Sequence, residues 1–150
     1  MYKMIGLLLL LSAFCFAGEP HKWNEEAIDW VAYKEATGLM KDKGKKGLLV
    51  VYADWCSTCR TFSKQFKDPS VVQASKSFVM IKANVEKDQE LAQKYNLDGS
   101  YVPRTFVLNE KGEVIEELYP EKPKWRFFLP SDNSAFLGAF MKRAATFSAH

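Results

Sequence analysis

Two cysteine residues, Cys56 and Cys59, stand close together near the middle of the chain. They follow residues 48–52, an apolar run of strand length. Two thiols at this spacing can form a disulfide only where the chain turns sharply, and a junction between a strand and a helix supplies such a turn. At the N-terminus of a helix, unsatisfied amides and the helix dipole favour the thiolate of the first cysteine. The pair therefore predicts thiol–disulfide redox chemistry.

Two other uses of the cysteine pair are a structural disulfide and a metal site. A disulfide that closes so short a loop constrains the unfolded chain little, so it would stabilise the fold weakly. A tetrahedral metal site needs two further ligands, and the only histidines, His21 and His150, stand near the ends of the chain, where we expect solvated side chains. We favour redox activity, with the Cys56–Cys59 disulfide as the reactive group and no metal or other cofactor.

The first 17 residues have the pattern of a signal peptide. Lys3 precedes an apolar stretch at residues 4–14, and small side chains follow at Cys15 and Ala17. We expect cleavage after Ala17, with retention of the segment as a membrane anchor as the alternative. Cleavage would leave a single domain of residues 18–150 in an oxidising compartment, where disulfides persist.

The charge and length of the chain limit its partners. A net charge of +3 over 150 residues is too weak to indicate binding to nucleic acid or to an anionic membrane. After signal cleavage we expect no stable insertion into a membrane. The mature length suffices for one hydrophobic core, so no metal or additional disulfide is needed for folding.

The apolar patterns predict the order helix, strand, helix, strand, helix, strand, strand, helix. Asn24 is expected to cap the first helix, and residues 109–112 form a hairpin turn between the last two strands. The helices are expected at residues 24–40, 59–66 with a short continuation capped by Ser70, 88–95, and from Ser131 or Asp132 onward; the strands at residues 48–52, 77–83, 104–108 and 113–118.

These elements predict an α/β fold. Helical crossovers between the early strands imply parallel pairing, and the late hairpin implies an antiparallel pair. The result is a mixed sheet of four to five strands flanked by helices, with the cysteines at the C-terminal end of the first strand. This is the order of elements in a thioredoxin fold.

Three stretches carry a more specific resemblance. Residues 52–60 (Tyr-Ala-Asp-Trp-Cys-Ser-Thr-Cys-Arg), 66–71 and 102–105 resemble the thioredoxin-like superfamily, and in particular the C-terminal periplasmic domain of DsbD. Residues 101–104 and the aromatic segment near residue 125 also resemble the small anterior-gradient proteins of the endoplasmic reticulum. The likeness covers about residues 22 to 145.

The resemblance implies a role for each residue around the cysteines. Cys56 would be the exposed attacking thiolate and Cys59 the buried resolving thiol, with Trp55 as a shield. Pro103 would be a cis proline facing the pair, so that Val102 presents its backbone to a substrate strand. An ordinary trans Pro103 is the alternative outside this context.

The chain also departs from these relatives. Val50 and Ser63 stand where the DsbD domain has acidic residues, so the usual proton relay to Cys59 is missing. Asp54 can substitute as a relay, although a solvated turn residue is the favoured interpretation. Ser57 and Thr58 do not indicate a redox potential, but their hydroxyls can donate hydrogen bonds to the thiolate.

Residues 119–130 form a proline-punctuated segment rich in aromatic and basic side chains. A lid packed over the edge of the sheet is the favoured interpretation. The alternative is a partner-docking surface made by Trp125, Arg126, Phe127 and Phe128, because aromatic and arginine residues are enriched at interfaces.

Together these observations predict a periplasmic thiol–disulfide oxidoreductase. Its partners would be protein thiols and disulfides and a redox partner protein, and the resemblance to DsbD favours the reductase direction. The alternative is a non-enzymatic partner-binding or chaperone module on the same fold.

Overall fold

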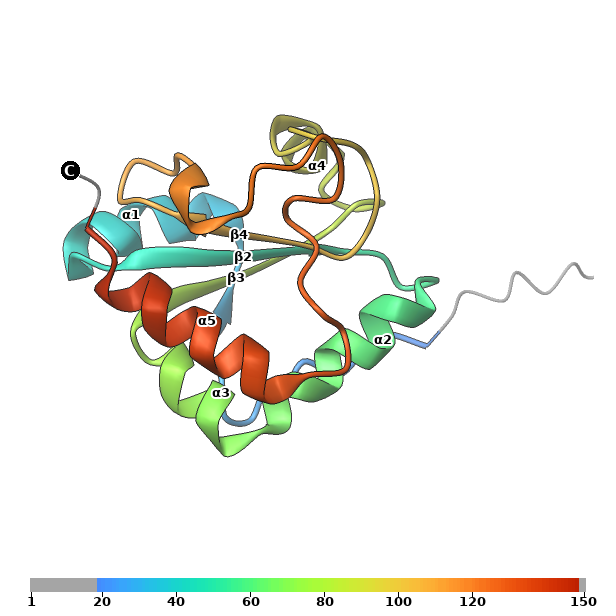
Figure 1. The fold of residues 1–150 in the computed structure, drawn as a ribbon, viewed down its shortest axis with the longest axis horizontal. Helices are drawn as coiled ribbons and strands as arrows, with labels where there is room; N and C mark the ends of the chain where they lie inside the picture. Colours follow the sequence, from blue (N-terminus) through green and yellow to red (C-terminus); the bar gives the residue numbers. More distant parts are fainter. Residues whose placement is uncertain (1–18, 149–150) are drawn as a thin grey trace, which may run out of the picture.

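The computed structural model describes residues 19–148. A four-stranded sheet in the order β1-β3-β2-β4 forms its centre. Figure 1 shows this sheet nearly edge-on, with α2, α3 and α5 on one side and α1 and α4 on the other. The elements are β1 (Trp30–Val31), α1 (Tyr33–Lys43), β2 (Lys46–Tyr52), α2 (Ser57–Lys64), α3 (Pro69–Ser75), β3 (Phe78–Asn84), α4 (Gln89–Lys94), β4 (Arg104–Leu108) and α5 (Ser134–Thr146), with short 3-10 helices at Gln65–Lys67 and Glu116–Leu118.

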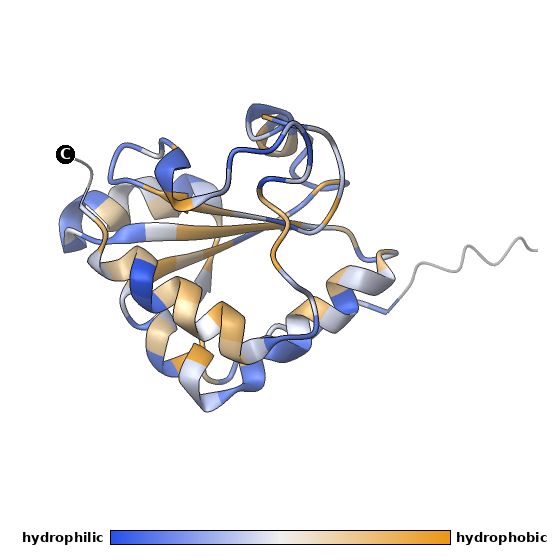
Figure 2. Ribbon diagram, in the orientation of Figure 1, coloured by the Kyte–Doolittle hydropathy of each residue, from blue (hydrophilic) through white to orange (hydrophobic). Residues whose placement is uncertain are grey.

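The sheet is mixed, as predicted. β2 runs parallel to β3, with Leu48 opposite Met80, and antiparallel to β4, with Leu48 opposite Val107. The interior residues of β2 are fully buried, because helices cover the sheet on both faces. In Figure 2 the hydrophobic colour follows the strands and much of α5. The predicted α/β thioredoxin fold is confirmed.

The predicted strand at residues 113–118 is wrong. Only Val114 makes an isolated bridge, to Leu108, before the chain enters a 3-10 helix. Beyond the Ile115 N–H, which donates to the Val107 carbonyl at 2.9 Å, the outer edge of β4 is satisfied by the Tyr119 hydroxyl, which accepts the Val107 N–H at 2.8 Å and donates to the Thr105 carbonyl at 2.9 Å. A side chain thus occupies the place of a fifth strand, and backbone groups at the edge stay paired.

The beginning of the chain also differs from the prediction. Asn24 adopts a left-handed φ of 59° and does not cap a helix, because its side chain donates to the carbonyl of Phe66 at 2.9 Å. Trp23 is fully buried, and the chain forms β1 beside β3 before α1 begins at Tyr33. Tertiary contacts of the N-terminal segment therefore replace the first half of the expected helix.

Two predicted helix caps are displaced by a few residues. Asp68, not Ser70, caps α3 by accepting the Ser70 N–H at 2.8 Å, and Pro69 takes the first helical position, where its missing N–H costs nothing. Asn133, not Ser131 or Asp132, caps α5 by accepting the Phe136 N–H at 2.9 Å. The predicted signal peptide, residues 1–17, lies outside the described residues.

Candidate active site

The cysteine pair lies where β2 passes into α2. Cys56 is the N-cap residue of α2, and its Sγ accepts the N–H of Cys59 at 3.0 Å. The first amides of a helix have no partner within the helix, so this sulfur fills the place that a Ser or Asp oxygen usually takes. An acceptor of this kind binds more strongly when it is charged. The turn therefore directs a backbone amide of α2 at the Cys56 sulfur.

Burial distinguishes the two thiols. Cys59 is completely buried, whereas Cys56 keeps 6% of its surface exposed. The prediction of an exposed Cys56 is therefore wrong in degree, because Ala53 and the partly buried side chains of Tyr52, Val85 and Val102 pack around the pair. Both cysteines are free thiols in the structure.

Cys59 holds its proton tightly. Burial raises the pKa of the Cys59 thiol far above its ordinary value, and its hydrogen bond to Cys56 and the charge that Cys56 can carry raise it further. Cys59 is therefore protonated at neutral pH. A protonated thiol is a poor nucleophile, so Cys59 suits the second step of a disulfide exchange, which follows the formation of a bond between Cys56 and another sulfur.

The loop before β4 approaches Cys56 from the other side. The peptide bond between Val102 and Pro103 is cis, and the Val102 carbonyl oxygen lies 3.7 Å from Cys56 Sγ. Pro103 is buried, whereas Val102 is partly exposed. The reactive sulfur and the backbone of Val102 therefore lie within reach of the same ligand.

The side chains next to the cysteines shield the sulfurs and hydrogen-bond to them less than the sequence predicted. Trp55 is 66% exposed and is not among the apolar side chains packed on the cysteine pair. Ser57 is exposed and Thr58 partly exposed, and within residues 19–148 neither hydroxyl donates to a sulfur. The contact with the thiol comes from the helix backbone instead.

Asp54 is held in place, so its interpretation as a solvated turn residue is wrong. Its carboxylate accepts a hydrogen bond from Asn84 Nδ2 at 2.9 Å and lies 4.0 Å from Lys87 Nζ, and its side chain is only 17% exposed. Asn84 ends β3, so this contact ties the cysteine turn to the neighbouring strand. A proton relay through Asp54 stays a prediction.

His21 was expected in a solvated tail, and this is also wrong. The residue is 93% buried, and its Nε2 lies 2.9 Å from the carbonyl oxygen of Ala53. A carbonyl only accepts, so Nε2 carries the proton. The same carbonyl accepts the N–H of Cys56 at 3.2 Å, which places His21 directly behind the cysteine turn. Its position near the chain end concealed this role in the sequence.

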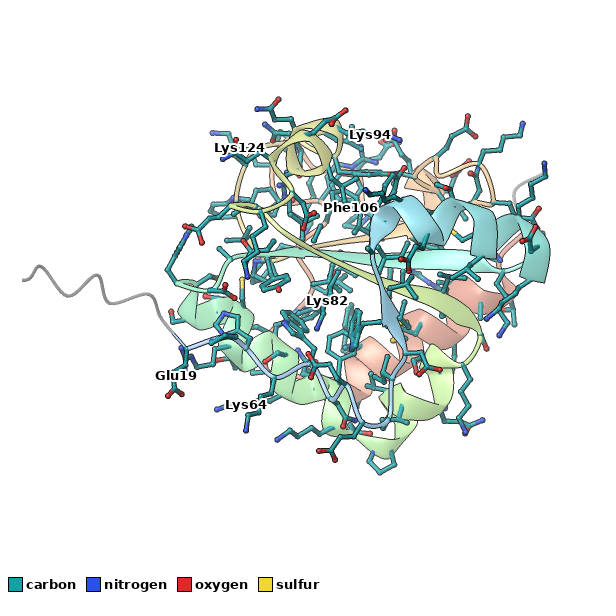
Figure 3. All side chains as sticks on the ribbon, turned by 180° about the vertical axis from the view of Figure 1, so that it is seen from behind. Glu19, Lys64, Lys82, Lys94, Phe106 and Lys124 are labelled. Carbon is teal, nitrogen blue, oxygen red and sulfur yellow. The ribbon has the colours of Figure 1, made fainter. Side chains whose placement is uncertain are left out.

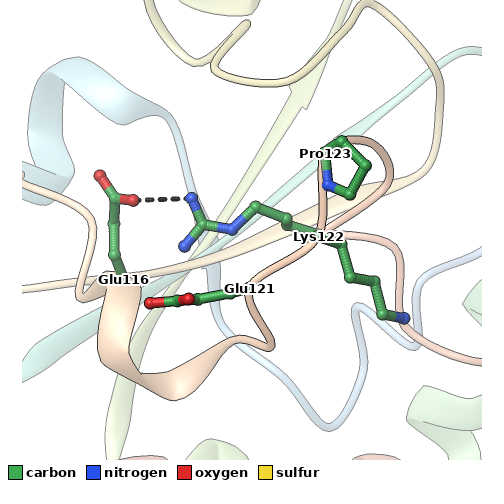
Figure 4. A pocket seen from close by; sticks show the side chains of 5 residues that line it. Glu116, Glu121, Lys122 and Pro123 are labelled. Atoms are coloured by element: carbon green, nitrogen blue, oxygen red, sulfur yellow. Dashed lines mark hydrogen bonds and ion pairs between the residues drawn. The ribbon is translucent and has the colours of Figure 1, made fainter.

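The aromatic segment divides into exposed and buried residues. Trp125 is 64% exposed and Phe128 38% exposed, so they lie on the surface as predicted for a docking site. Arg126 forms an ion pair with Glu116 at 2.8 Å beside a surface pocket that Glu121, Lys122 and Pro123 also line (Figure 4). Phe127 does not belong to this surface.

Phe127 is fully buried, so its assignment to a docking surface is wrong. Its ring centroid lies 4.6 Å from that of Phe106 and 4.8 Å from that of Tyr119. Its carbonyl also accepts the N–H of Thr105 at 2.8 Å. Phe127 and Tyr119 therefore anchor the segment over the edge of β4, as the lid interpretation expected.

The described part of the chain holds neither a membrane span nor an evident metal site. Between residues 19 and 148, no helix is long and apolar enough to cross a bilayer. In the same range, no three His, Cys, Asp or Glu side chains are gathered so that they could hold a metal ion.

Comparison with known proteins agrees with this geometry. The model of a family described as thioredoxin-like matches residues 29–110. The thiol:disulfide interchange protein DsbD of Salmonella typhimurium is 36% identical over 115 residues, which cover 75% of this chain and 17% of DsbD. Thioredoxin-like protein 1 of Schizosaccharomyces pombe is 37% identical over 82 residues, which cover 53% of this chain and 27% of that protein. The chain thus spans about a sixth of DsbD and about a quarter of the yeast protein.

Solved structures show the same fold. A disulphide isomerase from Xylella fastidiosa superposes with a TM-score of 0.54 at 23% identity, over 73% of this chain and 86% of that one. The first thioredoxin domain of mouse protein disulfide-isomerase A4 gives 0.58 at 16% identity, over 87% of this chain and 83% of that domain. Since the family model covers more than half of the sequence, and the Cys56–Cys59 turn stands beside a cis proline, the chain belongs to the thioredoxin-like family.

Proposed function

We propose that this protein is an exported thiol–disulfide oxidoreductase that exchanges disulfides with protein substrates through Cys56 and Cys59. The observation that carries the proposal is the position of Cys56 Sγ. It accepts an amide of the first turn of α2 and lies 3.7 Å from the Val102 carbonyl oxygen. Similarity to DsbD, whose name describes thiol:disulfide interchange, supports the same reaction.

In the reductase direction, the Cys56 thiolate attacks one sulfur of a substrate disulfide. The substrate S–S bond breaks, a mixed disulfide forms with Cys56, and the departing sulfur takes up a proton. Cys59 then loses its proton and attacks Cys56 Sγ, which releases the second substrate thiol. Two electrons have passed to the substrate, and the Cys56–Cys59 disulfide remains.

Return to the dithiol requires a partner protein that itself carries a dithiol, so a complete cycle needs both a substrate and a redox partner. The reductase direction is preferred because residues 52–60 and 66–71 resemble the DsbD domain. The leader-like pattern of residues 1–17 supports export, and similarity to DsbD supports the periplasm as the compartment. The reactive disulfide itself is the only redox group that the proposal needs.

The test is reduction of insulin by residues 18–150 with dithiothreitol as the electron donor. Cys56→Ser should lower the rate to that of dithiothreitol alone, because no sulfur remains to attack. Cys59→Ala, reduced first and then mixed with insulin after removal of the dithiothreitol, should accumulate a mixed disulfide that survives non-reducing electrophoresis, since the resolving thiol is gone. Ser57→Ala, an exposed change in the same turn, is the matched control and should keep the rate within about twofold.

Absence of activity in the unmodified protein would contradict the proposal and would favour a non-enzymatic binding module. The reduction potential of the pair, measured against glutathione, tests the direction. A value near that of thioredoxin, about −270 mV, would support reduction, and a value near −120 mV would contradict it.

A further inference from the structure

Arg104 is a buried charge beside the active site that the proposed reaction does not use. It is the first residue of β4, directly after Pro103, and only 1% of its surface is exposed. Within residues 19–148 it forms no ion pair, and its Nε has no hydrogen-bond partner. Burying an arginine without a carboxylate partner costs free energy, so other contacts must stabilise its charge.

Those contacts are almost all backbone carbonyls from one region. Nη1 donates to the carbonyls of Tyr95 at 3.1 Å and Gly99 at 2.9 Å, and Nη2 donates to the carbonyl of Ala92 at 3.4 Å. Nη1 also lies 3.5 Å from Asn96 Oδ1. The guanidinium therefore spans the end of α4 and the loop that follows it.

The end of α4 is suited to a positive charge. The last carbonyls of a helix have no partner within the helix and carry the negative end of its dipole. Figure 3 shows Lys94, the last residue of α4, on the same side of the sheet as Phe106 of β4, and the Tyr95 and Phe106 rings lie 5.3 Å apart. Arg104 thus joins the C-terminus of α4 to the beginning of β4.

The loop between these two points carries Val102 and Pro103. One guanidinium holds both of its ends, since Ala92 and Tyr95 precede the loop and Arg104 follows it. A second tie lies inside the loop, where the Tyr101 hydroxyl hydrogen-bonds to the Asp98 carboxylate at 2.9 Å. The Val102 carbonyl that faces Cys56 is therefore placed by a network centred on Arg104.

We infer that Arg104 is a positioning residue for protein substrates: it holds residues 96–103 so that the Val102 backbone can pair with a substrate strand beside Cys56. The inference rests on the proposed function. An extended peptide would use the Val102 backbone groups, whereas a small disulfide has no strand to pair and needs only Cys56. The two kinds of substrate therefore report different properties of the site.

We expect that a lysine at position 104 cannot take over the positioning role of the arginine. The guanidinium is a rigid fork with several donors, whereas the ammonium of lysine is a point charge on a flexible stem. Arg104→Lys keeps the charge but cannot reach carbonyls at both the end of α4 and Gly99. Arg104→Met keeps most of the packing volume and removes every donor.

The test compares KM and kcat for insulin with the rate of reaction with 5,5′-dithiobis(2-nitrobenzoate). We expect Arg104→Lys and Arg104→Met to raise the KM for insulin by about tenfold, because misplacing a binding group costs at least this much. The kcat for insulin and the rate with the small disulfide should stay within about twofold. Arg143→Lys and Arg143→Met are matched controls, since Arg143 also donates to a backbone carbonyl, that of Leu118 at 2.7 Å, in α5 away from the cysteines.

Tyr101→Phe is a milder second variant in case the Arg104 variants do not fold. It removes only the hydroxyl, which donates to Asp98 and accepts the Phe127 N–H at 3.2 Å, and we expect the KM for insulin to rise by about threefold. An unchanged KM in the Arg104 and Tyr101 variants would overturn the inference. Equal losses toward insulin and the small disulfide would also overturn it, because they indicate a general loss of folded protein. Inactivity of the unmodified protein toward both disulfides would instead overturn the proposed function.

Discussion

At the scale of single residues, the cysteine turn is held by contacts from behind as well as by α2. The carbonyl of Ala53 accepts both the His21 Nε2–H at 2.9 Å and the Cys56 N–H at 3.2 Å. The His21 ring also packs 6.1 Å from Tyr52 and 6.4 Å from Trp23, centroid to centroid. His21 therefore links the N-terminal segment to Ala53, at the start of the turn that ends in Cys56.

Substitution of His21 separates its hydrogen bond from its packing. The amide nitrogen of glutamine can reach the place of Nε2, so His21→Gln should keep the bond to Ala53, whereas His21→Leu keeps apolar packing and loses the donor. We expect His21→Leu to lower the free energy of unfolding by about 1 kcal/mol, and His21→Gln to lower it by less than half of that. Urea titration followed by fluorescence measures both values.

Equal losses in the two His21 variants would show that the ring packing, not the hydrogen bond, stabilises the turn. The reduction potential of each variant gives a second measurement on the same proteins. A shift in His21→Leu alone would tie the bond to the cysteine pair, because only that variant leaves the Ala53 carbonyl without a side-chain donor.

At the scale of elements, the edge of β4 shows how a segment without regular structure can close a sheet. The Tyr119 hydroxyl and the Phe127 carbonyl pair with the backbone of Thr105 and Val107, where another strand would otherwise lie. Asp98 accepts the Arg126 N–H at 2.6 Å, so the same segment also contacts the loop before Pro103. The aromatic segment therefore supports the active-site loop from outside.

Two aromatic residues two positions apart in this segment should behave very differently. Phe127→Ala should lower the free energy of unfolding by about 3–5 kcal/mol, because it leaves a cavity between Phe106 and Tyr119. Trp125→Ala should change it by no more than about 0.5 kcal/mol, because that ring is 64% exposed. Denaturant unfolding of both variants checks the difference, and similar losses would contradict the packing described above.

At the scale of the whole molecule, several buried groups keep their protons in the folded state. Burial is the largest cause of the raised pKa values of the Cys59 thiol and of the Tyr95, Tyr101 and Tyr119 hydroxyls. The charged forms would lie in an apolar interior, where they are poorly solvated. Because of these groups, the free energy of unfolding of the reduced protein depends on pH in the alkaline range.

The sign of this coupling follows from the raised values. Below about pH 8.5, the ordinary range of a free thiol, both states are protonated and the stabilisation is complete. As the pH rises, first the unfolded cysteine and above about pH 10 the unfolded tyrosines lose protons that the folded state retains, so stability falls. For the buried Tyr119 we expect a loss of about 1.4 kcal/mol per pH unit above pH 10.

Urea titrations at pH 8, 10 and 11 measure this effect. Tyr119→Phe is the control, because it removes one titrating group and should reduce the slope above pH 10 by about 1.4 kcal/mol per pH unit, although it also lowers stability through the lost bonds to Thr105 and Val107. A slope equal to that of the unmodified protein would contradict the assignment to Tyr119.

The sequence by itself determined the centre of the fold and the reactive pair. The run before Cys56 is continuously apolar, and such a run can be satisfied only by burial on both faces, so β2 and the turn after it were predictable. The same holds for β3 and β4, whose lengths and apolar character differ little from the predicted ranges. These features depend on local pattern, which the sequence displays directly.

Only the tertiary structure decided which polar and aromatic residues work together. His21, Arg104 and Phe127 each contact residues more than eight positions away along the chain, and no local pattern distinguishes them from exposed residues of the same type. Tyr119 takes the place of a strand because its hydroxyl reaches the edge of β4 across a distance in sequence of more than ten residues. Such contacts follow from how the elements pack, and this is why the supports of the active site became visible only in the folded molecule.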